Sequence, residues 1–321
     1  MKCGVLGLGS IGRRHAENLL LEGYEVNAYD PCEKRTRDIC KTGFNIFSCR
    51  DQVIDQSEAI IVASPNEYHF QDLDAAVKAG RHVFVEKPLT HSAKGMKRLL
   101  NKAIDNRVII FAGLNLRFHP AVSETRKIIL EGELGKIHWV RSISSSYLPD
   151  WRPSQDYRTG YVSKPKTGGV IFDVIHEIDL AGYLFGIPEV VCATAKTSGH
   201  LEIFSDDIAD IMLRHPTGLI TALHMDLITK PPKRITEISG DKGLLTIDLA
   251  GRHLKLTNRD GNIVADKVYD TSWDDDYRNE MSAFLSVING ADIPYCNGAE
   301  AFEIVKIAIA ARRLAGLPSC A

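Results

Sequence analysis

The first third of the chain alternates short apolar runs with longer amphipathic segments. The run over residues 59–63, Ala-Ile-Ile-Val-Ala, is apolar throughout, which suits a central parallel strand buried on both faces. The predicted strands cover residues 3–6, 25–29, 44–47, 59–63, 82–85 and 108–112, and the predicted helices cover residues 11–22, 32–42, 51–56, 70–79 and 92–105. This alternation predicts an α/β fold with a parallel, doubly wound sheet.

The pattern changes after residue 118, where long strands with alternating positions replace the short runs. Turn sequences such as Gly240-Asp241-Lys242-Gly243 separate these strands. The predicted strands cover residues 137–146, 190–197, 207–214, 219–225, 235–239, 244–249 and 253–257, and the predicted helices cover residues 121–131, 170–185, 276–288 and 299–314. We expect one domain over residues 1–118 and an α+β domain over residues 119–321, whose large, mostly antiparallel sheet leaves one face open.

A glycine-rich turn, Gly-Leu-Gly-Ser-Ile-Gly, joins the first predicted strand to the first predicted helix. Its G-x-G-x-x-G spacing between a strand and a helix is typical of a Rossmann domain that binds a dinucleotide. The first glycine permits the tight turn, the second lets a pyrophosphate approach the backbone, and the third lets the helix pack against the strand. Unpaired N–H groups at the helix start favour the phosphate charge. The expected cofactor contacts here are Gly7, Gly9, Ser10, Ile11 and Gly12.

Asp30 ends the second predicted strand, close to the ~20-residue offset at which an acid binds the adenosine ribose hydroxyls. A carboxylate there repels a 2′-phosphate, so Asp30 favours NAD over NADP. Arg35 lies nearby and can neutralise that repulsion, which leaves NADP open. A Rossmann-like hairpin that binds nothing, or another nucleotide, is the alternative to dinucleotide binding.

Composition narrows the function classes. The chain has 321 residues, 44% hydrophobic and 25% charged, with a net charge of −2, and carries no basic stripe that would favour nucleic acid or a membrane surface. Its seven cysteines never form a C-x-x-C motif, which indicates a reducing compartment. No apolar run approaches transmembrane length. We therefore expect a cytoplasmic globular protein of two domains.

Several short motifs then occur in a recognisable order along the chain. They are residues 7–12, Ser64-Pro65-Asn66 with His69, Glu86-Lys87-Pro88, Asn115 with Arg117, and Gly168-Gly169 followed by Asp173, His176 and Asp179. In this order the chain resembles the glucose–fructose oxidoreductase, inositol dehydrogenase and rhizopine-catabolism family (Gfo/Idh/MocA). The resemblance implies a nicotinamide-dependent oxidoreductase that acts on a sugar, an inositol or a sugar derivative.

The resemblance also assigns roles to the residues at the strand ends of the first domain. Ser64, Pro65 and Asn66 follow a strand's carboxyl end, where ligands bind in open α/β sheets, and we expect them on the nicotinamide side with Asn115 close by. The remaining cofactor-binding candidates are His69, Glu86 and Lys87. The position of His69 favours the start of a helix, and Glu86 contacts the nicotinamide ribose or holds its neighbour Lys87.

Lys87 is the first catalytic candidate, because the corresponding lysine is the usual catalytic group in the family. A lysine beside a carboxylate can donate to the substrate oxygen and relay its proton, provided that burial or neighbouring charge shifts its pKa toward neutrality. The alternative is a strand-end lysine that pairs with Glu86 at the surface.

His176 and Asp173 form the second catalytic candidate pair. They lie three residues apart and would share a face of one helix. The family often spaces this pair four apart, and Phe172 occupies that position here. Either Asp173 reaches the site from a neighbouring angle or His176 works largely alone, while Asp179 orients His176 or caps a neighbour. We expect Lys87 and His176, from separate domains, to converge above the nicotinamide.

A metal site built from His176, Glu177 and Asp179 is the competing interpretation. Glu177 would point about 100° away from His176 on a helix. The sequence offers no second His or Cys cluster to supply further ligands, so we expect no metal.

Aromatic and arginine side chains are interleaved over residues 147–158. Flat aromatic faces suit sugar rings, and arginine forks suit carboxylates or phosphates. Trp151, Arg152, Tyr157 and Arg158 therefore form a candidate substrate wall or lid. The alternative is a loop that packs on its own chain or on a subunit partner.

Three functions remain distinguishable from these residues. The first is an NAD(P)-dependent dehydrogenase that acts on the secondary hydroxyl of a sugar or polyol, which includes sugar acids and nucleotide-sugars. The second is an NAD-retaining lyase or glycosidase that uses transient oxidation, and the third is a non-catalytic dinucleotide-binding sensor. The open sheet face of the second domain predicts a homodimer or homotetramer.

Overall fold

The computed structural model describes residues 1–37, 43–153 and 155–318 of the chain. These residues form two compact units, one of residues 1–114 with 277–305 and one of residues 115–276 with 306–318. The break after residue 114 lies close to the predicted boundary at residue 118. The prediction divided the chain at a single point. In the structure, residues 277–305 belong instead to the first unit.

The sheet of the first unit is parallel, as the alternating pattern predicts. Within the described residues its strand order is β3-β2-β1-β4-β5-β6. The strands are β1 Lys2–Leu6, β2 Glu25–Tyr29, β3 Asn45–Ile46, β4 Ala59–Val62, β5 His82–Glu86 and β6 Ile110–Gly113. All four residues of β4 are buried, as expected for a central strand. Leu6 pairs with Val62 and Val62 with Val85, so the carboxyl ends of β1, β4 and β5 lie side by side.

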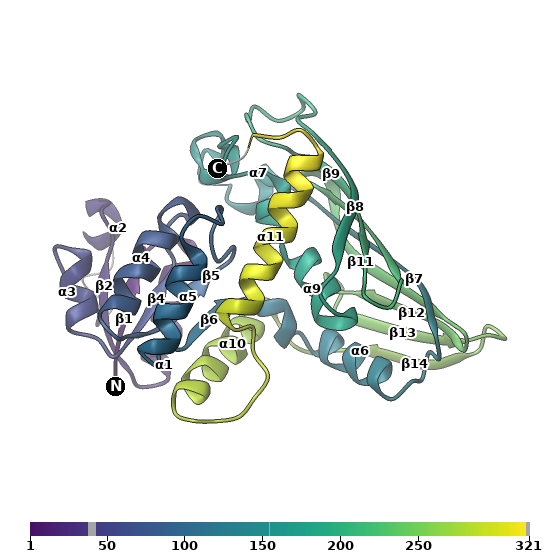
Figure 1. Cartoon of the computed structure of the whole chain (residues 1–321), viewed down its shortest axis with the longest axis horizontal. Coiled ribbons are helices and arrows are strands. Elements are labelled where there is room, and N and C mark those ends of the chain that lie inside the picture. Colours follow the sequence, from purple (N-terminus) through teal and green to yellow (C-terminus); the bar gives the residue numbers. More distant parts are fainter. Residues whose placement is uncertain (38–42, 154, 319–321) are drawn as a thin grey trace. The chain divides into compact units, whose positions relative to one another are not determined.

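Helices connect these strands (Figure 1). They are α1 Ser10–Leu21, α2 Glu33–Arg37, α3 Arg50–Asp55, α4 Asn66–Lys78 and α5 Met96–Asp105. Helix α4 begins four residues before the predicted start at residue 70, and α5 begins four residues after the predicted start at residue 92. Residues 38–42 of the predicted second helix, with Cys40, lie outside the described residues, as does Cys320.

Two long helices lie in the last fifth of the chain, α10 Trp273–Ile288 and α11 Gly298–Leu314. Phe284 of α10 contributes to the core of the first unit, with its ring centroid 5.7 Å from those of both Phe84 and Phe111. Aromatic contact therefore joins this distant helix to strands β5 and β6.

The sheet of the second unit is mostly antiparallel, as predicted. Within the described residues its order is β14-β13-β12-β11-β7-β10-β9-β8, and the β7–β10 pair is parallel. The strands are β7 Ile137–Tyr147, β8 Glu189–Lys196, β9 Ile208–Arg214, β10 Ile220–Asp226, β11 Ile228–Gly240, β12 Gly243–Asp248, β13 His253–Asn258 and β14 Ile263–Val268. Strand β14 has no counterpart in the prediction, because it is an edge strand with no buried residue and no apolar alternation.

One face of this sheet carries the helices of the second unit, and α6 and α9 lie on the same side of it (Figure 1). The core between them includes Val122 of α6, Leu180 of α9, and Val140 and Ile238 of the sheet. The helices and turns here are η1 Asn115–Phe118, α6 Pro120–Leu130, α7 Leu148–Trp151, η2 Tyr157–Thr159, η3 Tyr161–Ser163, α8 Val170–Asp173 and α9 His176–Phe185.

The predicted helix over residues 170–185 is wrong in one place, because Val174 and Ile175 interrupt it and separate α8 from α9. Two consecutive β-branched residues lower the helix propensity at this point. The N–H of Glu177 bonds to the carbonyl of Val174, only three residues back, which tightens the turn into α9. Among the described residues, no helix has both the length and the apolar character needed to cross a membrane.

Candidate active site

The glycine turn of the first unit has the geometry that its spacing predicts. Gly7 has a φ of +94°, and a Cβ at this position would lie 2.7 Å from the backbone of Ala63 and Ser64. A Cβ on Gly12 would lie 1.9 Å from the carbonyl oxygen of Gly7, so only glycine allows α1 to pack here. A Cβ on Gly9 would meet no atom within 4 Å. The backbone at Gly9 is therefore open to a ligand, as a pyrophosphate cradle requires.

Asp30 ties the end of β2 to the glycine turn. Its carboxylate is 5% exposed and accepts hydrogen bonds from the backbone N–H groups of Leu8, at 2.7 Å, and Cys32, at 2.8 Å. The guanidinium of Arg35 donates to the same carboxylate at 3.2 Å. Asp30 thus has a structural task besides any ribose contact, and Arg35 offsets part of its negative charge.

A cavity of about 530 Å³ opens at the carboxyl ends of β1, β2 and β4. Four predicted cofactor contacts line it, namely Gly7, Asp30, Ser64 and Pro65. Ser10 and Ile11 are the first two residues of α1, at the end that faces a bound phosphate in this type of turn. The structure therefore brings the separate sequence motifs to one edge of the parallel sheet, where open α/β sheets bind ligands.

Asn66 and His69 follow this edge on α4, and neither caps the helix, whose N-cap is Pro65. The expectation that His69 starts or caps a helix is therefore wrong, since the helix begins at Asn66. The imidazole is buried, with Nδ1 2.8 Å from the carbonyl oxygen of Pro88 and Nε2 2.7 Å from that of Ser64. Burial lowers the pKa of His69, although both carbonyl contacts favour the protonated ring. His69 thus links the ends of β4 and β5 from inside the protein.

Lys87 follows directly after β5 and is half-buried. Its backbone N–H donates to Oε2 of Glu86 at 3.2 Å. Glu86 itself is 8% exposed, and its other oxygen lies 2.6 Å from Nε2 of His15. The structure thus shows Glu86 in contact with the Lys87 backbone, one of the two roles expected for it. His15 had no place in the sequence-based site, because a lone histidine on a helix carries no signal of its own.

In the second unit, Asp173 ends α8 and His176 begins α9. Both side chains are buried, but they do not share one helix, so the helical argument for a common face is wrong. Asp173 accepts a hydrogen bond from the hydroxyl of Tyr161 at 2.6 Å. Tyr161 lies twelve residues earlier in a short 3-10 turn, and the sequence contained no pattern that singled it out.

The two acids that follow His176 are each bound by an arginine. Glu177 accepts from Arg234 at 2.8 Å and from Ser142 at 2.7 Å. Asp179 has no exposed surface and forms a two-pronged ion pair with Arg117. Asp179 thus links α9 to η1, and its expected roles, orienting His176 or capping a neighbour, stay predictions. These pairings also supply Glu177 and Asp179 with partners other than a metal.

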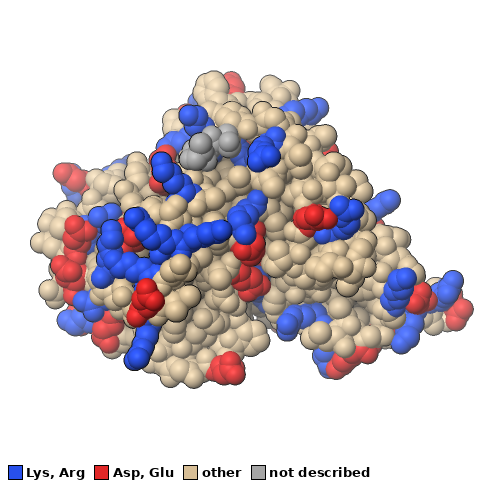
Figure 2. Space-filling view, viewed as in Figure 1, with Lys and Arg blue, Asp and Glu red and all other residues tan. Residues whose placement is uncertain are grey.

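The remaining candidates differ in exposure. Asn115 begins η1 in the second unit and is buried. In the aromatic and arginine-rich stretch, Trp151 and Arg152 are exposed and Tyr157 is half-buried. The guanidinium of Arg158 donates to the carboxylates of Asp156 and Glu202, and the shortest distance to each is 2.7 Å. Exposed carboxylates therefore already bind this guanidinium. The face drawn in Figure 2 carries both basic and acidic side chains.

Two models of one protein family match this chain. The model of the oxidoreductase family with an NAD-binding Rossmann fold matches residues 1–114, and that of the GFO/IDH/MocA C-terminal domain matches residues 122–246. Together they span most of the chain. The chain belongs to the GFO/IDH/MocA family. It is an oxidoreductase of that family, and its first unit is the NAD-binding Rossmann domain.

Individual relatives match most or all of the chain. Myo-inositol 2-dehydrogenase of Thermotoga maritima is 27% identical over 98% of this chain and 96% of its own length. The 2,7-anhydro-N-acetylneuraminate hydratase of Mediterraneibacter gnavus is 28% identical over 70% of this chain and 60% of its own length. A solved levoglucosan dehydrogenase in complex with NADH has a TM-score of 0.86, covers all of both chains and is 18% identical, which shows the shared fold.

Proposed function

We propose that this chain is an NAD-dependent dehydrogenase that oxidises a secondary hydroxyl of a sugar, an inositol or a sugar derivative, including sugar acids and nucleotide-sugars. The observation that carries the proposal is the position of Lys87. It follows β5 directly, at the sheet edge that also holds the glycine turn and the 530 Å³ cavity. The family relatives that act on inositol and levoglucosan favour a polyol or sugar substrate.

The first unit supplies the residues that would hold the dinucleotide. They are Gly7, Gly9, Ser10, Ile11, Gly12, Asp30, Ser64, Pro65, Asn66, His69 and Glu86, with Asn115 from the second unit. His69 and Glu86 act in this proposal through the backbone that they hold, because both are buried and bonded internally. When bound, the nicotinamide supplies the hydride acceptor. The open backbone at Gly9 is the feature of the structure that fits a pyrophosphate.

The proton chemistry falls to side chains of the protein. The neutral amine of Lys87 receives the proton of the substrate hydroxyl at Nζ, and the ammonium so formed stabilises the developing alkoxide. His176 is the second acid–base group, because an imidazole exchanges protons near neutral pH. Asp173, held by Tyr161, is a candidate orienting group at the same end of α9.

The proposed substrate wall consists of Trp151, Arg152, Tyr157 and Arg158. If a Trp151→Ala and Arg158→Ala double variant has unchanged KM and kcat, these residues do not face the substrate.

The cofactor preference rests on Asp30. Its carboxylate disfavours a 2′-phosphate, while the Arg35 contact at 3.2 Å weakens that repulsion. We therefore propose NAD as the preferred cofactor, with measurable use of NADP. Parallel assays of kcat/KM with NAD and with NADP test this preference.

The outer face of the eight-stranded sheet is the proposed oligomer interface. Trp139, Ile143 and Met212 on this face are 37%, 43% and 41% exposed. They alternate with buried residues along β7 and β9, and the exposed charged residues Arg141, Asp210 and Arg214 share this face, so apolar side chains point outward among charged ones. We propose a homodimer or homotetramer in the cytoplasm. A wild-type monomer in solution, or unchanged mass in an Ile143→Asp, Met212→Asp variant, contradicts the interface.

A hydratase or lyase that retains NAD is the second candidate, and the hydratase relative favours it. In such an enzyme each cofactor molecule returns to its starting state, so no reduced cofactor accumulates. Net accumulation of NADH with an added polyol supports the dehydrogenase. Product formation without NADH accumulation supports the alternative.

The deciding experiment is a panel of sugars, inositols, sugar acids and nucleotide-sugars assayed with NAD and NADP by absorbance of the reduced cofactor. Lys87→Met serves as the inactive control, and its NADH binding is measured by fluorescence. Binding of NADH without turnover of any substrate favours a sensor. Failure to bind either dinucleotide refutes the proposal.

A further inference from the structure

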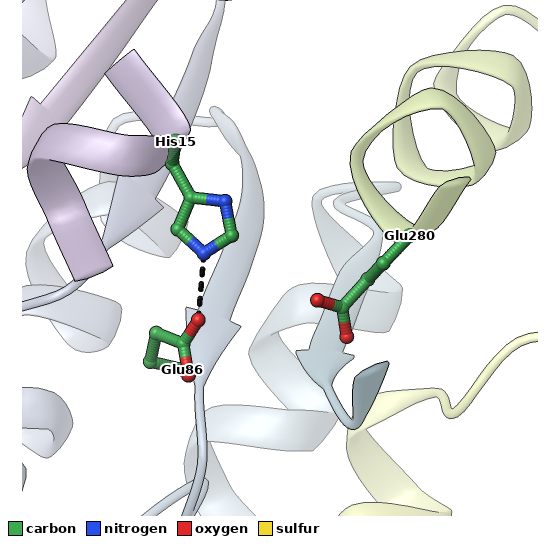
Figure 3. Close-up of side chains that lie close together, drawn as sticks. All are labelled: His15, Glu86 and Glu280. Carbon is green, nitrogen blue, oxygen red and sulfur yellow. Dashed lines mark hydrogen bonds and ion pairs between the residues drawn. The ribbon is translucent and has the colours of Figure 1, made fainter. Parts of the chain in front are cut away.

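Three side chains from distant parts of the first unit converge beside the segment Glu86-Lys87-Pro88 (Figure 3). His15 comes from α1, Glu86 from the end of β5 and Glu280 from α10. One ring nitrogen or carboxylate oxygen from each lies within 4.8 Å of the others. His15 and Glu280 have no exposed surface. A polar cluster so completely buried is costly unless its members hold one another.

His15 and Glu86 are in direct contact within this cluster. Nε2 of His15 lies 2.6 Å from Oε1 of Glu86, and within the described residues Nδ1 has no hydrogen-bond partner. The rings of Phe84 and Tyr277 lie edge-on to the imidazole, with centroids 4.9 Å and 5.9 Å away. Aromatic walls keep the local dielectric low, which strengthens a bond between histidine and carboxylate. The contact with Glu86 therefore orients the ring.

The same carboxylate also reaches the backbone of the lysine. Oε2 of Glu86 accepts from the N–H of Lys87 at 3.2 Å, while Oε1 faces His15. On the other side of Lys87, the carbonyl of Pro88 lies 2.8 Å from the ring of His69. Two buried histidines thus hold the residues that flank Lys87. The backbone that carries the Lys87 side chain is therefore held in place on both sides of this residue.

A metal ion does not explain the cluster as well as a hydrogen bond does. Metal–ligand bonds of 2.0–2.2 Å place neighbouring ligand atoms roughly 2.9–3.4 Å apart around one ion. The separation of 2.6 Å between His15 and Glu86 is shorter than that and matches a charge-assisted hydrogen bond.

We infer that His15 is a positioning residue for Lys87, with Glu280 as the third member of the cluster. His15 lies on the second turn of α1, whose first turn follows the glycine cradle. By holding Glu86, it couples the helix that receives the pyrophosphate to the backbone of the proposed catalytic lysine. The inference rests on the proposed function, and it adds two residues that no sequence motif includes.

The test compares two substitutions of His15 with one matched control. His15→Ala removes the contact with Glu86, whereas His15→Gln places an amide N–H near the position of Nε2. His82→Gln is the control, since His82 lies at the opposite end of β5 and its Nδ1 accepts from the N–H of Ile109 at 3.1 Å. Each purified variant is checked for folding by circular dichroism. Its kcat, its KM and its NADH dissociation constant are then measured.

His15→Ala is expected to lower kcat about 10–100-fold, the cost of a misplaced catalytic group, with KM and NADH affinity little changed. His15→Gln recovers most of the lost kcat, and His82→Gln retains the wild-type value. A positioning role predicts this split between kcat and KM, which a general loss of stability does not produce. Equal kcat in His15→Ala and His82→Gln overturns the inference, as does an equal loss in His15→Ala and His15→Gln.

A second readout separates failure of this inference from failure of the proposed function. Reductive methylation of Lys87, followed by mass spectrometry, reports the setting of its amine whether or not the enzyme turns over. The rate is expected to change in His15→Ala and to remain at the wild-type value in His15→Gln and His82→Gln. An unchanged rate in His15→Ala overturns the inference. A wild-type melting temperature that rises with Zn²⁺, and does not rise in His15→Ala, also overturns it by assigning a metal site.

Discussion

The two candidate catalytic side chains are surrounded by differently built contacts. Around Lys87 in the first unit, imidazole rings hold the neighbouring groups. His15 contacts the carboxylate of Glu86 at 2.6 Å, and His69 contacts the carbonyl of Pro88 at 2.8 Å. Both rings are buried. His69 holds the backbone carbonyl after the lysine, and His15 holds the side chain of Glu86, whose other oxygen accepts from the backbone N–H of Lys87.

Around His176 in the second unit, guanidinium groups bind the neighbouring carboxylates. Arg234 binds Glu177, and Arg117 binds Asp179 in the two-pronged geometry that suits a carboxylate. The arginines keep their charge at every pH at which the protein folds. Burial, by contrast, lowers the pKa of the His69 imidazole.

The two regions should therefore respond differently to the loss of one contact. A buried arginine–carboxylate pair leaves an uncompensated charge when one partner is removed, so the second unit should respond mainly in stability. A histidine that orients a backbone segment contributes less to stability and more to placement, so the first unit should respond mainly in turnover.

Substitution of the catalytic candidates themselves gives the largest expected change. Lys87→Met should lower kcat about 10³-fold with NADH binding retained, because the substrate proton then has no acceptor. His176→Gln should lower kcat about 10²-fold. Steady-state assays measure both, with Lys97→Met as the control, since Lys97 is exposed on α5. If kcat falls further in His176→Gln than in Lys87→Met, His176 and not Lys87 is the main proton acceptor.

Removal of a buried arginine is expected to act on stability. Arg117→Ala should reduce the free energy of unfolding by about 3–5 kcal/mol, because Asp179 would remain buried and charged. Arg126→Ala is the matched control: both guanidinium groups lie over the ring of Tyr183, at 4.6 Å and 4.8 Å, so it removes a similar cation–π contact but not the ion pair. The control should cost about 1 kcal/mol or less. Urea unfolding that shows equal losses would break the contrast between the two regions.

Low pH should reduce the stability of the second unit by protonating a histidine rather than by disrupting its arginine–carboxylate pairs. Burial, with a smaller effect from the positive charge of Arg252, lowers the pKa of His119 to about 4. The unfolded form binds the proton at a pKa of about 6.5, so this contribution to stability is complete above pH 6.5 and is lost between pH 6.5 and 4. The loss should reach roughly 1–3 kcal/mol at pH 4.

The variant His119→Asn tests this prediction by removing the titration. The side chain of His119 accepts from the N–H of Ala121 at the start of α6, and asparagine is also a good N-cap residue. Urea unfolding at pH 7 and pH 4.5 should show a smaller pH-dependent loss in the variant than in the wild type. An identical loss in both proteins would assign the acid sensitivity to other groups.

The smallest expected effect concerns the choice of dinucleotide. Asp30→Asn keeps an oxygen for the N–H of Leu8 but removes the charge that repels a 2′-phosphate. The ratio of kcat/KM for NADP to that for NAD should rise by a factor on the order of 3–10, the result of about 1 kcal/mol of repulsion, because the Arg35 guanidinium already offsets part of the carboxylate charge. Arg35→Ala should move the ratio in the opposite direction. A wild type that prefers NADP would refute this role of Asp30.

Prediction from sequence succeeded where the chain carries local patterns. The buried run over residues 59–63 identified a central strand, and the glycine spacing identified the turn whose geometry depends on Gly7 and Gly12. It was less accurate where the pattern is weak. Strand β14 lacks apolar alternation, and the interruption at Val174 lies within an apolar segment that reads as one helix.

Local sequence was enough to predict the alternating strands and helices of the first unit, the dinucleotide turn and the position of Lys87 after a strand, because each depends on residues close together in the chain. The side chains that surround these groups became known only from the folded chain. Glu280 is 194 positions away from Glu86, and Asp179 is 62 positions away from Arg117. Neighbours so far apart in the chain leave no periodic signal, since they meet only when hydrophobic burial folds the backbone around them.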